Sequence, residues 1–115
     1  MDATAYLAYA ARHPEERFDL VVIDPPTFGA GNARRGVKPW KAVADYPDVL
    51  RAAVRVLTPG GAIFASTNAR ELAADGALRE MVEASMGAVR WEPLPSWPDD
   101  VRERGRVAAV LFRPR

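Results

Sequence analysis

The sequence predicts an α/β fold in which helices cover a mostly parallel β-sheet. Two short apolar runs rich in β-branched residues, FDLVVID at 18–24 and AIFAS at 62–66, are typical of strands buried on both faces. Segments with helical spacing of apolar residues alternate with these runs. This alternation of helices and strands is the pattern of a layered sheet built from parallel strands.

The individual elements follow from spacing and from stop signals. Helices are expected at 3–12, 43–57 and 70–85, where apolar residues recur on one helical face. Strands are expected at 18–24, 62–66, 88–91 and 107–112. Proline and two glycines in TPGG, at 58–61, end the second helix. Because only a proline-rich loop at 92–98 and no long helix joins the last two strands, they are expected to be antiparallel neighbours at one edge of the sheet.

Composition excludes several function classes. The length of 115 residues predicts a single domain, 1–115. The formal net charge of +1 gives no global electrostatic signal for binding to nucleic acid or to a membrane. Because the chain has no cysteine, the sequence excludes a disulfide, a thiolate metal site and a cysteine nucleophile. Because His13 is the single histidine, we expect no metal site. No apolar run reaches the roughly 20 residues of a membrane span, so we expect a cytoplasmic protein without membrane contact.

The most informative motif is DPPTF, Asp24 to Phe28, at the carboxyl end of the first predicted strand. Ligands of open α/β sheets bind outside the carboxyl ends of the strands. Pro25 and Pro26 fix the backbone without adding donors, so that nearby carbonyl oxygens can accept hydrogen bonds, and Phe28 offers an apolar face to a planar base. The alternative is that the two prolines simply end the strand.

FDLVVIDPPTF, followed about thirty residues later by LTPGGAIFASTN, resembles the second half of the class I S-adenosylmethionine-dependent methyltransferase fold. The order of a DPP-[ST]-F motif, a basic loop, a helix and a PGG turn is most similar to the methyltransferases of large-subunit ribosomal RNA bases. The resemblance implies a partial Rossmann-like fold, with a mostly parallel sheet and an antiparallel C-terminal edge strand. The glycine-rich loop and the ribose-binding acidic residue of that family have no counterpart here, so residues 1–115 are expected to be a C-terminal half whose N-terminal strands are missing.

The resemblance also implies roles for individual residues. The catalytic set at the transferred methyl group would be Asp24, Pro25, Pro26 and Phe28. S-adenosyl-L-methionine would be the cofactor and would contact Asp24, Asp2 and Ala3, although Asp2 serves equally well as the N-cap of the first helix.

A basic loop lies between the prolines and the second helix. Its cationic and aromatic side chains could track phosphates and stack on an unpaired base, which predicts contact through Arg34, Arg35, Lys38 and Trp40. The alternative is a solvated loop. Asn68, after the second strand, is a further candidate partner for a base.

The expected function is S-adenosylmethionine-dependent methyl transfer by direct displacement to a nucleic acid base, with ribosomal RNA as the first candidate and RNA preferred to DNA. Two alternatives stay open. The chain could be a truncated, non-catalytic fragment, or it could be a binding or assembly module. In the second case an exposed sheet edge would pair with a partner chain or with a second copy.

Overall fold

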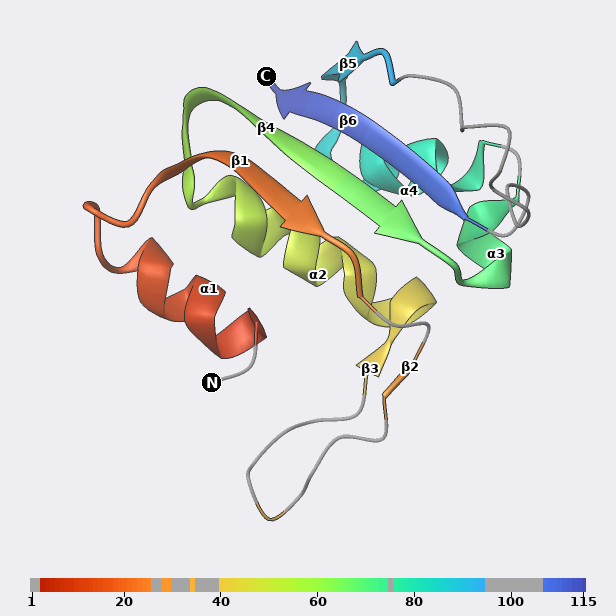
Figure 1. Cartoon of the computed structure of the whole chain (residues 1–115), viewed down its shortest axis with the longest axis horizontal. Coiled ribbons are helices and arrows are strands. Elements are labelled where there is room, and N and C mark those ends of the chain that lie inside the picture. Colours follow the sequence, from red (N-terminus) through yellow and green to blue (C-terminus); the bar gives the residue numbers. More distant parts are fainter. Residues whose placement is uncertain (1–2, 26–27, 30–33, 35–39, 75, 95–106) are drawn as a thin grey trace, which may run out of the picture.

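The computed structural model describes residues 3–25, 28–29, 34, 40–74, 76–94 and 107–115. Its main sheet contains β1 (Phe18–Ile23), β4 (Leu57–Thr67), β6 (Ala108–Pro114) and β5 (Val89–Glu92), in the order β1-β4-β6-β5 (Figure 1). Strands β1 and β4 are parallel, whereas β6 is antiparallel to both β4 and β5. Three strands therefore run in one direction and the C-terminal strand runs against them, which confirms the expected α/β class.

The C-terminal strand lies one position in from the edge of the sheet. Strands β4 and β5 are consecutive in the chain but are not neighbours in the sheet. Strand β6 lies between them and is antiparallel to both, so that β5 is the edge strand. Ile63 of β4 pairs with Phe112 of β6, and Phe112 pairs with Trp91 of β5. The expected antiparallel pairing of the last two strands is confirmed by this register.

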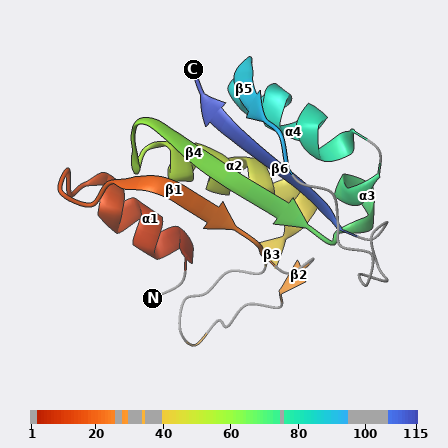
Figure 2. The same cartoon turned by 45° about the horizontal axis from the view of Figure 1, so that its top comes forward.

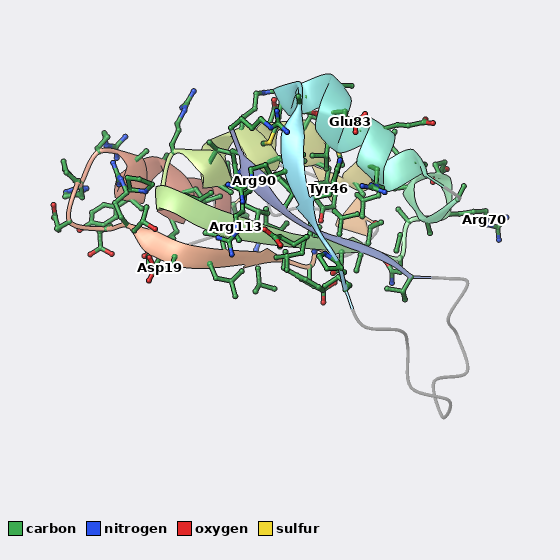
Figure 3. The ribbon with its side chains drawn as sticks, turned by 90° about the horizontal axis from the view of Figure 1, so that it is seen from above. Asp19, Tyr46, Arg70, Glu83, Arg90 and Arg113 are labelled. Atoms are coloured by element: carbon green, nitrogen blue, oxygen red, sulfur yellow. The ribbon has the colours of Figure 1, made fainter. Side chains whose placement is uncertain are left out.

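In the described part of the chain, four helices accompany the sheet: α1 (Ala3–Ala11), α2 (Ala42–Val54), α3 (Arg70–Ala73) and α4 (Ala77–Met86). Seen from above, they lie on one side of it (Figure 3). The helix expected at 70–85 is divided into α3 and α4, because Gly76 adopts a φ of 75°, a left-handed conformation that glycine tolerates best. Among the described residues, no helix is long and apolar enough to span a membrane.

The hydrophobic core lies between the helices and the face of the sheet that they cover. Large side chains with no exposed surface come from α2, from β4, from α4 and from β6; they include Leu50, Ile63, Val82 and Phe112. A smaller cluster of Leu7, Ala10 and Val56 attaches α1 to α2. These contacts hold the strand ends in a fixed relation to one another.

The second face of β1 is not covered by the described residues, so the expectation that the 18–24 run is buried on both faces was wrong for this structure. Ile23 is 7% exposed, whereas Leu20 and Val22 are 54% and 61% exposed. The physical reason is that all described helices lie on one side of the sheet, while side chains alternate between its faces. Among the described strands, β1 also lies at the edge of the sheet.

The segment expected as a plain loop between the first strand and the second helix contains a short antiparallel ladder. Strand β2 (Phe28–Gly29) pairs with β3 (Trp40–Lys41), with Phe28 opposite Lys41 and Gly29 opposite Trp40. Strand β3 leads directly into α2, where Asp45 accepts a hydrogen bond from the Lys41 backbone N–H at 2.7 Å. The ladder lies beyond the carboxyl end of β1 (Figures 1 and 2).

Arg17 closes the C-terminal end of α1. Its Nη1 donates to the carbonyl oxygens of Ala10, Glu16 and His13 at 2.8, 2.9 and 3.2 Å, one in the last turn of α1 and two in the segment that follows it, and so ties the end of the helix to the start of β1. We expect Arg17→Ala to lower the free energy of unfolding by about 1–3 kcal/mol, measured by urea denaturation. Arg12→Ala, at an exposed arginine of the same helix end, is the control and should change it by less than about 0.5 kcal/mol. Equal losses in both variants would contradict the capping role.

Candidate functional site

The carboxyl ends of β1 and β4 bring together two of the residues singled out in the sequence. Asp24 directly follows β1 and Asn68 directly follows β4. Because these strands are parallel neighbours, with Ile23 paired to Ala65, both side chains start from the same edge of the sheet. Asp24 is exposed and the following Pro25 is half-buried. An exposed carboxylate therefore lies where ligands of such sheets bind.

Ser66 holds the carboxylate of Asp24 in place. Its Oγ donates to Oδ1 of Asp24 at 2.6 Å, within the range of short hydrogen bonds between a hydroxyl and a carboxylate. Ser66 is only 6% exposed, near the end of β4. The second carboxylate oxygen of Asp24, Oδ2, has no donor within the described part of the chain.

Tyr46 joins the two strand ends from the helix side. It comes from α2, has no exposed surface, and its hydroxyl donates to the Ser66 carbonyl oxygen at 2.7 Å, with the Ile23 carbonyl oxygen at 3.3 Å. A hydroxyl has a single proton, so the shorter contact is the principal bond. Burial, and secondly the negative charge of Asp24, raise the pKa of the phenol, which stays a neutral donor.

The raised pKa of Tyr46 predicts a loss of stability in alkaline solution. A tyrosine whose pKa is higher in the folded than in the unfolded chain stabilises the fold fully below the unfolded pKa, near 10, and this stabilisation is lost as pH rises toward the folded pKa. We expect the free energy of unfolding to fall as pH increases above about 10, and Tyr46→Phe to reduce this slope. Urea denaturation at a series of pH values measures the slope of the free energy of unfolding against pH. The same slope in Tyr46→Phe and the unsubstituted chain would contradict the assignment.

The structure describes only some of the candidate site residues. Ala3 begins α1, so its backbone N–H has no acceptor within the helix. Arg34 is exposed. The backbones of Phe28 and Trp40 belong to the β2–β3 ladder, but their side chains lie outside the described part. The residues that lie outside it entirely are Asp2, Pro26, Arg35 and Lys38.

Sequence reasoning missed Ser66 and Tyr46. Each had a signal: Ser66 is the polar end of an otherwise apolar strand, and Tyr46 lies four residues before Leu50 on the buried face of α2. A buried tyrosine requires a partner for its hydroxyl, and strand-end carbonyls can provide one. The pairing between them depends on strand register, which the sequence does not show.

No family model matches the chain. A Bacillus subtilis (strain 168) protein, YwbD, named as a candidate ribosomal RNA large subunit methyltransferase, is 38% identical over 68 residues, which are 59% of this chain and 16% of that protein. The ribosomal RNA large subunit methyltransferase K/L of Alcanivorax borkumensis (strain ATCC 700651) is 31% identical over 93 residues, 81% of this chain and 12% of that protein.

The solved structures that the chain resembles are also described as methyltransferases. SMU.776, described as a candidate methyltransferase and solved in complex with SAH, superposes with a TM-score of 0.79 at 25% identity, over 98% of this chain and 30% of that one. A candidate SAM-dependent methyltransferase from Streptococcus mutans gives 0.73 at 26% identity, over 98% of this chain and 29% of that one. The chain thus spans less than a third of the length of each of these relatives. In fold and in sequence it resembles class I S-adenosylmethionine-dependent methyltransferases, and its sequence relatives include those of large-subunit ribosomal RNA.

Proposed function

We propose that this chain takes part in methyl transfer from S-adenosylmethionine to a nucleic acid base, with ribosomal RNA as the substrate class. The observation that carries the proposal is the exposed carboxylate of Asp24, held by Ser66 at the carboxyl ends of two parallel strands. Its position in a fold similar to an SAH-bound methyltransferase supports it, as do the names of the sequence relatives.

The described residues fit a cofactor and a base at this edge. Oδ2 of Asp24 can accept a hydrogen bond from an amino group, either the ammonium of the cofactor's methionine moiety or the exocyclic amine of a base. The N–H of Ala3 can donate to the adenine ring, with Asp2 beside it in the sequence. The cofactor, when bound, supplies an electrophilic methyl group on a sulfonium.

The residues of the chain would act by positioning. A nucleophilic atom of the base must approach the methyl group in line with the carbon–sulfur bond. Orientation of this kind can lower the activation free energy by several kcal/mol. We assign Asp24 and the carbonyls beside Pro25 and Pro26 to hold the base, and Phe28 to pack against it. This mechanism requires no covalent intermediate on the enzyme, which suits a chain without cysteine.

RNA contact is proposed for the segment between β1 and α2. Arg34 is exposed there, and Arg35, Lys38 and Trp40 are its sequence neighbours in the same segment. Cationic side chains position a nucleic acid through its phosphates, and an aromatic ring can stack on an unpaired base. Asn68, across the strand ends from Asp24, would add a hydrogen bond to the base edge.

We further propose that residues 1–115 form the C-terminal half of a larger methyltransferase domain. Two features support this: the open face with Leu20 and Val22, and the position of β1 at the sheet edge. Exposed apolar side chains beside a strand with unpaired backbone groups favour further packing by polypeptide. The same features allow an assembly module made of two copies of the chain.

A methylation assay tests the proposed reaction. Unmethylated large-subunit ribosomal RNA is incubated with methyl-labelled S-adenosylmethionine and this chain, alone and joined to the remainder of such a domain. We expect label in the RNA in the joined form, and its loss in Asp24→Ala. A preparation that binds S-adenosylmethionine but leaves the RNA unlabelled would contradict the proposal. Sedimentation at micromolar concentration tests the second candidate, since a stable dimer would favour the assembly module.

A further inference from the structure

Two aspartates at opposite ends of β1, Asp19 near its start and Asp24 directly after it, are held in the same manner. At the amino end, Thr58 Oγ1 donates to Asp19 Oδ1 at 2.8 Å; at the carboxyl end, Ser66 Oγ donates to Asp24 Oδ1 at 2.6 Å. Both donors come from β4. Figure 3 shows Asp19 at one end of the molecule and Arg70, which opens α3 shortly after β4, at the other. Only Asp24 lies at the end where ligands of parallel sheets bind.

The burial of the two donors differs. Ser66 is 6% exposed, whereas Thr58 is half-buried. A hydroxyl with little access to water has few alternative partners, so its hydrogen bond to a carboxylate is retained. Ser66 lies within 3.5 Å of the Ile23 carbonyl oxygen as well, but its single proton goes to the closer, charged acceptor.

The backbone that carries both side chains is itself fixed. The Tyr46 hydroxyl bonds the carbonyl oxygen of Ser66 and lies 3.3 Å from that of Ile23, the residue before Asp24. Both contacts are buried under α2. The Cα positions of Ser66 and Asp24 are therefore held from the helix side, while their side chains meet each other one residue beyond the last pair of β1 and β4, Ile23 with Ala65.

We propose that Ser66 is a positioning residue for Asp24: it engages Oδ1 and thereby leaves Oδ2 as the oxygen that accepts from a ligand amino group. The inference deepens the proposed function and rests on it for the nature of the ligand. The positioning itself belongs to the free chain. Ser66→Ala removes the donor and lets the Asp24 side chain sample other staggered rotamers, whereas Ser66→Thr keeps a hydroxyl.

The test measures the χ1 rotamer of Asp24 by three-bond scalar couplings in the isotope-labelled 115-residue chain. We expect one dominant rotamer in the unsubstituted chain and in Ser66→Thr, and rotamer averaging in Ser66→Ala. Thr58→Ala is the matched control, since it frees Asp19 and should leave Asp24 unchanged. A single Asp24 rotamer retained in Ser66→Ala, or averaging already present in the unsubstituted chain, would overturn the proposal.

A second readout separates positioning from general stability. In a preparation active in methyl transfer, Ser66→Ala should lower kcat/KM about tenfold, the size of one hydrogen bond to a charged group, and Ser66→Thr should restore most of it. Failure of methyl transfer in the unsubstituted preparation would count against the proposed function alone, because the rotamer comparison requires no ligand. Unchanged kcat/KM in an active Ser66→Ala preparation would overturn the positioning role.

Discussion

Asp24→Ala is expected to reduce kcat/KM for methyl transfer roughly 100-fold, because a base or cofactor amine that loses its acceptor is misplaced relative to the methyl group. Asp24→Asn keeps one acceptor oxygen and should lose less. The measurement is the rate of label transfer from S-adenosylmethionine to ribosomal RNA in an active preparation containing this chain.

Asp19→Ala provides a closely matched control for that substitution. Asp19 lies in β1, is exposed like Asp24, and also accepts a hydrogen bond from a β4 hydroxyl, but it is at the amino end of the strand, whereas Asp24 follows the carboxyl end. We expect its activity to stay within about twofold of the unsubstituted protein, as for a surface change away from the site. Equal losses for Asp19→Ala and Asp24→Ala would show that the effect comes from the fold and not from the carboxyl edge.

Phe112→Ala is expected to lower the free energy of unfolding by about 3–5 kcal/mol, a large share of the roughly 5–15 kcal/mol that stabilises a domain. Phe112 has no exposed surface, points to the helix-covered face of β6, and meets the Trp91 ring edge-on at a centroid distance of 5.7 Å. Removing its ring leaves a cavity between β4, β5 and α4. Urea denaturation measures the loss.

Leu111→Ala is the matched control, because Leu111 is the neighbouring residue of β6 and faces the opposite, open side of the sheet. It is only half-buried, so its truncation should cost about 1 kcal/mol or less. A loss as large as that of Phe112→Ala would mean that the open face is covered in solution. Such a result would favour the assembly of two copies.

The elements that sequence predicted well are those with a strong local pattern. The β-branched run of β1 and the apolar stripe of α2 determine a strand and an amphipathic helix, and the prolines after Asp24 mark where the strand ends. The division of α3 from α4 depended on Gly76, whose left-handed conformation the sequence allows but does not require. The β2–β3 ladder was missed because two-residue strands have no periodicity.

The candidate site divides in the same way. Asp24 and Asn68 could be named from sequence because each follows a predicted strand, and parallel strands end at a common edge. Ser66 and Tyr46 could not, since their roles depend on the pairing of β1 with β4 and on the placement of α2 beneath both. The exposure of Leu20 and Val22 was equally hidden, because a strand sequence does not show which of its faces the helices of this chain cover.

A titration of the 15N-labelled chain with S-adenosylmethionine, followed through backbone amide chemical shifts, tests the central claim most directly. The claim is that the carboxyl edge of β1 and β4 is part of a methyltransferase site. It predicts weak, saturable shifts confined to Ala3, Asp24, Asn68 and their neighbours, and none around Thr58 at the other end of the sheet. No shifts at millimolar ligand, or shifts centred away from this edge, would contradict it.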